Sequence, residues 1–146
     1  MRERYSMLRQ EHKFFINTYD IPRLHNSLEV LMPLDPNCTD KKPYTLTSVY
    51  FDSYKDNDLH QKINGIRYRE KYRLRFYGND VNRAKFEIKR KNENTVEKVS
   101  VRLNSTEIKK ILRCDYSSLK NYKELEYVAH RMMFLEYKPK TIVKYD

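Results

Sequence analysis

The chain has 146 residues and a formal net charge of +10, and its 34% charged and 39% hydrophobic residues suit a single domain with a thin apolar core. It contains no run of the ~18 apolar residues that a membrane-spanning helix needs, and no apolar stretch typical of a signal peptide near its first residue, so we expect a cytoplasmic protein without a membrane span. Two distant cysteines and four scattered histidines argue against a disulfide framework and a zinc site, whereas the excess of Lys and Arg favours a partner that carries phosphate groups.

The first part of the chain predicts a strand followed by a helix. Residues 9–16 alternate Arg, Glu and Lys with Gln, His, Phe and Ile, which indicates a strand. Asp20 is the expected N-cap of a helix that ends near Pro33. The apolar stripe of this helix, at helical spacing, consists of Leu24, Leu28 and Leu31.

A second strand and a second helix are predicted after a loop over residues 35–43, which is rich in Pro, Asn and Asp. Tyr44–Asp52 is β-branched and aromatic, which is typical of a strand. Lys55–Asn64 predicts a short helix. We expect Gly65 to end it, because helices often close on a left-handed residue that is usually glycine.

Three further segments predict an antiparallel meander. They are Tyr68–Tyr77, Ala84–Lys91 and Thr95–Leu103. Their links, Gly78-Asn79-Asp80 and Asn92-Glu93-Asn94, have the composition of tight turns.

The last part of the chain predicts two helices and a strand. Asn104 and Glu107 have the spacing of a capping box, which starts a short helix that ends near Cys114. Residues 117–137 carry the longest helical pattern, and Thr141–Tyr145 predicts the last strand.

Cations gather on one face of the predicted meander. Successive side chains of a strand point to opposite faces. The four cations of Tyr68–Tyr77 therefore share one face, and its apolar and aromatic side chains share the other. The same division recurs over Ala84–Lys91 and, more weakly, over residues 9–16. The residues on the charged faces are Arg69, Lys71, Arg73 and Arg75; Lys85, Glu87, Lys89 and Lys91; and Arg9, Glu11 and Lys13.

Like charges at neighbouring positions of a sheet repel each other, so this arrangement costs stability unless an anion neutralises it. One such strand would be read as a solvated exterior, because charged residues lie mostly outside. Three strands of this kind favour a phosphate-binding face, where Arg gives forked contacts and Lys a movable charge. Glu11 and Glu87, each among cations, would either hold a hard metal ion that bridges phosphates or orient the neighbouring lysines.

These segments together resemble the VTC domain of the CYTH/triphosphate tunnel superfamily, from about residue 9 to the end of the chain. The resemblance rests on five pieces that keep the family's order and spacing. They are Arg9-x-Glu11-x-Lys13-Phe14; Tyr50-Phe51-Asp52; Lys62 with Gly65; Arg69-x-Lys71-x-Arg73-Leu74-Arg75-x-Tyr77-Gly78; and Phe86-Glu87-Ile88-Lys89-Arg90-Lys91.

The resemblance implies an α+β fold in which flanking helices surround an antiparallel β tunnel or barrel. A single domain over residues 1–146 would supply the N-terminal portion of this tunnel and would lack the family's later strands, including a second Glu-x-Lys strand. Either the sequence is a piece of a longer protein, or a partner completes the tunnel, in a homo-oligomer or a strand-swapped dimer.

The resemblance also implies an activity: a polyphosphate polymerase that transfers the γ-phosphate of ATP to a polyphosphate chain with Mn²⁺ or Mg²⁺. The catalytic residues that it implies are Lys13, Arg73, Arg75 and Lys89. The resemblance also implies Lys62 and Lys98 as phosphate-binding residues. The strand pattern adds Arg9, Arg69, Lys71 and Lys91, and it makes Glu11 and Glu87 the candidate metal ligands.

Two other functions remain open from the sequence: a triphosphate hydrolase with the same tunnel chemistry, and a module that binds polyphosphate or a nucleotide without turnover. We do not expect a nucleic-acid partner. Aromatic side chains that stack on bases would have to interleave with the cations, whereas Tyr72 and Phe76 fall on the opposite face of their strand.

Overall fold

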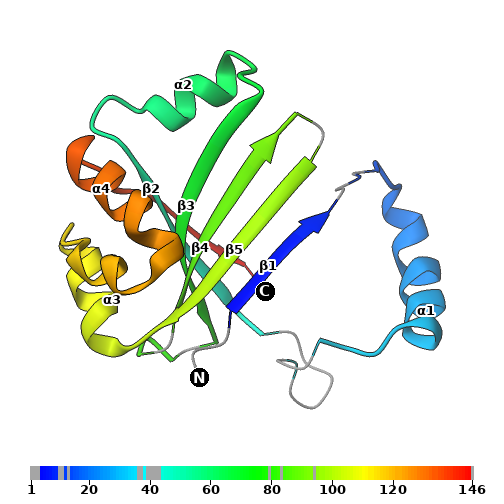
Figure 1. Cartoon of the computed structure of the whole chain (residues 1–146). Coiled ribbons are helices and arrows are strands. Elements are labelled where there is room, and N and C mark those ends of the chain that lie inside the picture. Colours follow the sequence, from blue (N-terminus) through cyan, green and yellow to red (C-terminus); the bar gives the residue numbers. More distant parts are fainter. Residues whose placement is uncertain are drawn as a thin grey trace.

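A computed structural model describes residues 12, 14–35, 38, 44–78, 80–82, 84–93 and 95–145, together with the backbone of Arg4–Arg9. Within this part of the chain, one antiparallel sheet has the strand order β1-β5-β4-β3-β2-β6 (Figure 1). Its strands are β1 (Arg4–Arg9), β2 (Leu46–Asp52), β3 (Tyr68–Tyr77), β4 (Ala84–Asn92), β5 (Thr95–Leu103) and β6 (Lys138–Tyr145). The sheet is open over the described residues, with β1 and β6 at its edges.

The helices lie mainly on one side of this sheet, which gives the predicted α+β class. Figure 1 shows α3 and α4 on the same face, while α1 stands apart from them beyond β1. The α-helices are α1 (Ile21–Leu31), α2 (Asn57–Ile63), α3 (Ser105–Leu112) and α4 (Glu126–Phe134); the 3₁₀ turns are η1 (Thr18–Asp20), η2 (Ser117–Asn121) and η3 (Lys123–Leu125). No helix in the described part of the chain combines the length and the apolar character that crossing a membrane requires.

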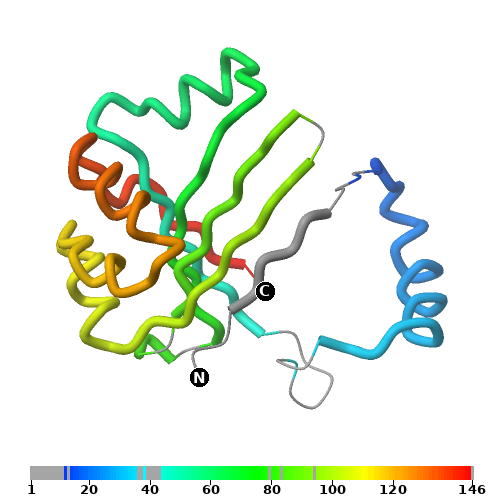
Figure 2. The backbone as a smooth tube through the Cα atoms, viewed as in Figure 1, coloured from blue at the N-terminus to red at the C-terminus, as the bar shows by residue number. Residues whose placement is uncertain are grey.

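The meander of β3, β4 and β5 is confirmed, and the tube in Figure 2 follows it through two hairpins. Gly78 has a φ of +63° where β3 ends, and Glu93 has a φ of +50° in the link between β4 and β5. Glycine adopts such left-handed backbone without a steric penalty, which suits Gly78 to the turn after β3.

The two faces of the meander differ as the alternation predicts. Tyr72, Leu74 and Phe86 are fully buried between the sheet and the helices that cover this face. They pack with apolar residues of α3, η2 and α4 in a single core cluster. The cations of β3 and β4 therefore lie on the opposite face, away from α3 and α4.

The strand predicted over residues 9–16 is wrong in its position. The strand β1 ends at Arg9, and residues 14–17 have no regular structure. The register explains the difference, because Arg9 pairs with Val96, one residue from the end of β5. Beyond this pair β5 continues for one residue only, Thr95, so an alternating sequence alone does not extend the strand.

The single helix predicted over residues 117–137 is also wrong, since this segment forms η2, η3 and the shorter α4. Tyr122 interrupts it with extended backbone, at φ −116° and ψ 113°. Its hydroxyl donates to the backbone carbonyl of Arg102 at 3.2 Å and lies 3.1 Å from Oε1 of Glu107. These tertiary contacts outweigh the local helical pattern.

The other predicted elements are confirmed with small shifts. Asn104 and Glu107 form the capping box of α3, and Gly65 follows α2 with a φ of +66°. The helix α1 begins after Asp20 as predicted, although the Asp20 side chain makes no capping hydrogen bond and no residue of α1 is buried. The last strand starts earlier than predicted and includes Pro139, which an edge strand tolerates next to an irregularity in its pairing.

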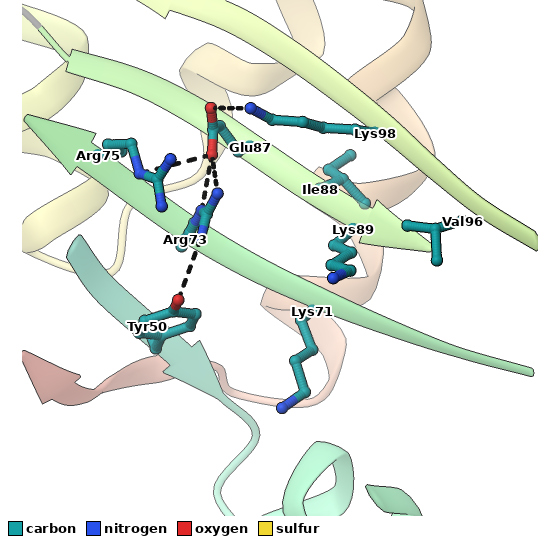
Figure 3. A pocket seen from close by; sticks show the side chains of 9 residues that line it. All are labelled: Tyr50, Lys71, Arg73, Arg75, Glu87, Ile88, Lys89, Val96 and Lys98. Carbon is teal, nitrogen blue, oxygen red and sulfur yellow. Dashed lines mark hydrogen bonds and ion pairs between the residues drawn. The ribbon is translucent and has the colours of Figure 1, made fainter. Parts of the chain in front are cut away.

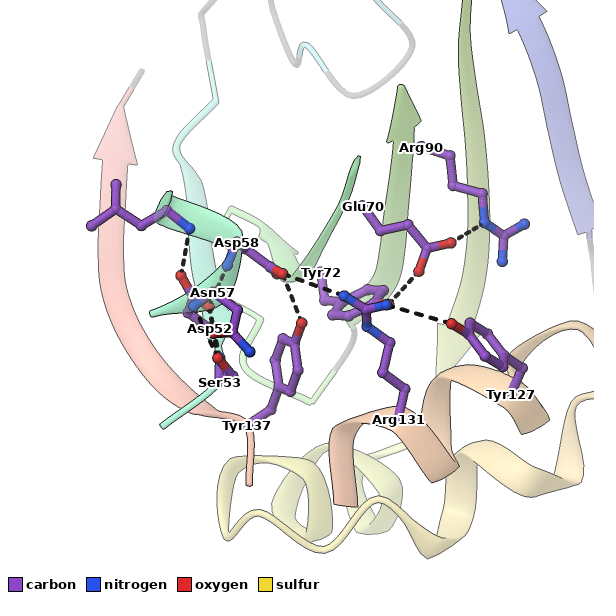
Figure 4. A network of polar contacts seen from close by, with 11 residues as sticks. Asp52, Ser53, Asn57, Asp58, Glu70, Tyr72, Arg90, Tyr127, Arg131 and Tyr137 are labelled. Atoms are coloured by element: carbon purple, nitrogen blue, oxygen red, sulfur yellow. Dashed lines mark hydrogen bonds and ion pairs between the residues drawn. The ribbon is translucent and has the colours of Figure 1, made fainter. Parts of the chain in front are cut away.

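A polar network ties α2 and α4 to the core face of the sheet (Figure 4). Asp52 accepts hydrogen bonds from the backbone amides of Asp58 and Leu59 at 2.9 and 3.0 Å, so it caps α2. Asp58 accepts a hydrogen bond from the hydroxyl of Tyr137 at 2.7 Å and lies 3.8 Å from the guanidinium of Arg131. The network fixes α2 against the end of β2.

Candidate polyanion-binding site

Neighbouring strands bring the predicted cations together through their register. Lys71 of β3 pairs with Lys89 of β4, and Lys89 pairs in turn with Lys98 of β5. Arg73 pairs with Glu87. Each of these residues lies on the face that α3 and α4 leave uncovered, because they alternate with the buried core residues of the same strands.

These side chains line a cavity of about 450 Å³ (Figure 3). Its lining consists of Tyr50, Lys71, Arg73, Arg75, Glu87, Ile88, Lys89, Val96 and Lys98. Five of the nine residues are cations and one is an acid, which leaves a surplus of four positive charges. A cavity of this size and charge suits a small polyanion.

Glu87 is the centre of the cluster, and its side chain is only 2% exposed. Its Oε2 lies 2.6 Å from both Nε and Nη2 of Arg73, which is a forked contact. Its Oε1 lies 2.7 Å from Nζ of Lys98, and Nε of Arg75 is 3.8 Å from Oε2. One buried carboxylate of β4 thus fixes three cations that converge on it from β3 and β5.

The protonation states follow from these contacts. Burial raises the pKa of Glu87, but the hydrogen bond from Lys98 and the charges of Arg73, Lys98 and Arg75 outweigh it and hold the pKa below its usual range. Burial lowers the pKa of Arg73, but Glu87 and the Tyr50 hydroxyl outweigh that effect and raise it. Both groups are therefore charged at neutral pH.

Hydroxyl groups orient the two arginines, and sequence reasoning did not assign these hydroxyls to the site. Arg73 Nη1 donates to the hydroxyl of Tyr50 at 3.1 Å. Arg75 donates through Nη2 to Tyr145 at 2.9 Å and through Nε to Ser48 at 3.3 Å. Tyr50 and Ser48 alternate with buried Val49 and Phe51 in the sequence, so strand periodicity could have placed them on the cation face.

Lys71 differs from the cations around Glu87, because among the described residues it has no carboxylate within ion-pair distance. Its Nζ points into the cavity without a dashed contact in Figure 3. Burial, then the charges of Lys62 and Arg69, lower its pKa. The surroundings of this lysine disfavour its positive charge, and a bound anion would offset that effect.

The remaining predicted residues fall into two groups. Arg69 and Lys91 pair with each other one register step beyond Lys71, and Lys62 lies on α2 close enough to act on the pKa of Lys71. The other group consists of Arg9, Glu11 and Lys13. Glu11 and Lys13 lie outside the described residues, and only the backbone of Arg9 is described.

The described residues are poorly suited to hold a metal ion. No three His, Cys, Asp or Glu side chains gather to hold an ion in this part of the chain. Among the described residues Glu87 is the one carboxylate in the cavity lining, and both of its oxygens face cations. Of the two roles predicted for Glu87, the geometry favours orienting the cations over holding a metal.

The cavity can therefore bind and align phosphate oxygens. Arginines with fixed guanidinium planes suit forked contacts to phosphate, and the lysines add mobile charges. No side chain of the described lining is a poised nucleophile. The lining consists of five cations, one buried acid, one tyrosine and the apolar residues Ile88 and Val96.

Comparison with known proteins agrees with this geometry. The VTC domain family matches residues 8–146, nearly the whole chain, and no curated protein matches it. VTC domains indicate a polyphosphate-related function, and a cavity lined by converging cations fits a polyanion. The chain therefore belongs to the VTC domain family.

Proposed function

We propose that this domain is a polyphosphate polymerase-like phosphotransferase that moves the γ-phosphate of ATP onto the end of a polyphosphate chain. The observation that carries the proposal is the cluster of cations around one buried carboxylate, in a cavity of about 450 Å³. Neighbouring cations repel each other, and a protein keeps such an unfavourable arrangement where its function gains from it.

The proposed reaction needs little chemistry from side chains. A terminal oxygen of the polyphosphate chain attacks the γ-phosphorus of ATP, the bond from that phosphorus to the β–γ bridging oxygen breaks, and ADP leaves with the electron pair. Arg73 and Arg75 would bind the transferring group, while Lys71, Lys89 and Lys98 would neutralise the phosphates on either side. Positioning and charge neutralisation supply most of the catalysis in phosphoryl transfer.

We further propose that the curved sheet is one wall of a phosphate tunnel. The cation face is free of α3 and α4, and both sheet edges are available for pairing in the described part of the chain. Association of two copies would cover this face, which is why a homo-oligomer or strand-swapped dimer remains our prediction. Mn²⁺ or Mg²⁺ stays a prediction as well, as an ion that enters with the phosphates and adds to charge neutralisation.

A non-catalytic binding module is the second candidate, and the open sheet favours it. Phosphoryl transfer depends on excluding water from the reacting groups, and a sheet with one uncovered face excludes it less well than a closed tunnel. Binding of a polyanion needs only the converging cations.

The test is to incubate the protein with ATP and Mn²⁺ or Mg²⁺ and to identify the products. Long phosphate chains together with ADP would support the polymerase. Free phosphate alone would indicate a hydrolase. Tight binding of polyphosphate without turnover would indicate the binding module, and absence of both binding and turnover would contradict the proposed function altogether.

Lys71→Met sharpens this test, because it removes a charge and keeps the aliphatic stem. We expect the affinity for tripolyphosphate to fall about ten- to a hundredfold, the loss of one charge-assisted hydrogen bond. Stability should stay unchanged or rise, since the variant relieves the repulsion from Lys62 and Arg69. Lys120→Met is the matched control, since Lys120 is exposed on η2; equal effects of the two substitutions on affinity would count against the site.

A further inference from the structure

A second cavity, of about 400 Å³, lies one register step from the candidate site. It is lined by Gly65, Arg67, Arg69, Lys91 and Glu93. We propose that this cavity is an outer subsite that binds the continuing part of a long polyphosphate chain whose end occupies the first cavity. This inference rests on the proposed function and adds a preference for chain length to it.

The register makes the two cavities consecutive along the strands. Arg69 pairs with Lys91, and two residues further along, on the same face, Lys71 pairs with Lys89 in the first cavity. Each step of two residues advances about 7 Å along a strand. The cation rows from Arg75 to Arg69 thus extend over six residue-to-residue steps, about 20 Å, so one extended chain can contact both cavities.

The charges of the outer cavity also suit a polyanion. Three cations and one carboxylate line it, which leaves a surplus of two positive charges. Glu93 pairs with Arg67 at 3.4 Å in an exposed ion pair, which is weak. Arg69 Nη1 donates to the backbone carbonyl of Ile66 at 2.9 Å, which holds its guanidinium beside the loop after α2.

A positive region joins the two cavities. Burial lowers the pKa of Lys71, and the charges of Lys62 on α2 and of Arg69 lower it further. The opposing effects of Tyr50 and Asp58 on this pKa are smaller, so cations dominate the passage from Arg69 to Lys71. A chain of phosphates along this passage would meet attraction at each step.

The outer cavity differs from the first in rigidity. The first holds its arginines against buried Glu87 and the hydroxyls of Tyr50 and Tyr145. Arg67 and Glu93 of the outer cavity have side chains that are 77% and 54% exposed. Fixed groups suit the reacting phosphates, and exposed mobile cations suit a chain that must slide as it grows.

The experiment compares two ligands on the full chain: tripolyphosphate and polyphosphate of about a hundred units. The test variant is Arg67→Gln with Lys91→Met, and the matched control is Arg113→Gln with Lys120→Met, two exposed cations on the helical side. We expect the ratio of long-chain to tripolyphosphate affinity to fall about tenfold in the test variant, the equivalent of about 1.4 kcal/mol. The control should leave the ratio unchanged. A longer ligand binds more tightly simply because it offers more positions for binding. Comparing the affinity ratios of the variants removes this effect.

Lys71→Met separates the two cavities, because it should lower the affinities for both ligands by a similar factor. Equal losses for the two ligands in the Arg67/Lys91 variant, or no loss at all, would overturn the outer subsite while leaving the proposed function intact. If the unmodified protein binds neither ligand, the proposed function fails, and the outer subsite fails with it. Thermal denaturation of each variant verifies that it is folded.

Discussion

At the scale of single residues, Glu87 contacts three cations of the candidate site. It is buried in a cavity where every other charged side chain of the described lining is a cation. Burying a carboxylate is unfavourable in itself, and the forked contact with Arg73 and the contact with Lys98 offset this cost. The residue stabilises the cation cluster in the absence of phosphate.

Glu87→Gln tests this role. We expect the free energy of unfolding to fall by about 3–5 kcal/mol, as when one partner of a buried ion pair is removed. Added tripolyphosphate should then stabilise the variant more than the unmodified protein, because the anion replaces the lost charge. Urea denaturation with and without tripolyphosphate measures both effects, with the exposed Glu136→Gln as control. An equal gain in the two proteins would contradict the role.

At the scale of elements, the attachment of α2 depends on one titrating group. Asp58 lies in this helix, 4% exposed, and burial raises its pKa to about 6, with the nearby Asp52 adding to the effect and Tyr137 and Arg131 opposing it. An acid with a raised pKa stabilises the fold while it is protonated. That contribution is complete below the unfolded pKa of about 4 and is lost as the pH rises through about 6.

Asp58→Asn removes the titration and keeps an acceptor for Tyr137. Between pH 4.5 and pH 7, the unfolding free energy of the unmodified protein should fall by about 2 kcal/mol relative to the variant, from 1.36 kcal/mol per pKa unit. Urea denaturation at the two pH values measures the difference. Parallel pH profiles for the two proteins would show that Asp58 does not titrate in this range.

At the scale of the whole molecule, the net charge of +10 and the one-sided placement of the cavity cations predict stabilisation by polyanions. Polyphosphate at a hundred times its Kd should add about 2.7 kcal/mol, which raises the Tm by about 5–10 °C for a chain of this size. The shift should shrink steeply with added salt, since exposed charges are screened. Thermal denaturation at two salt concentrations, with sulfate at matched ionic strength as control, measures it; a shift that sulfate reproduces would contradict specific binding.

Much of the fold could be predicted from the sequence because its signals are local. The alternation in Tyr68–Tyr77 sets which side chains share a face, since the pleat alternates them whatever the strand pairs with. The capping box of Asn104 and Glu107 and the turn at Gly78 depend on only a few neighbouring residues. These features are correct to within a residue or two.

The sequence by itself also determined the cation face, because strand periodicity placed Lys71, Arg73 and Arg75 together before any pairing was known. Only the tertiary structure decided how they are balanced: that Glu87 faces Arg73, that Tyr50 orients it, and that Lys71 has no such acid among the described residues. It also decided where β1 stops and where Tyr122 breaks the last helical segment. The physical reason is range, since periodicity acts between neighbours in the chain, whereas charge balance and strand length depend on residues that the fold brings together from far apart.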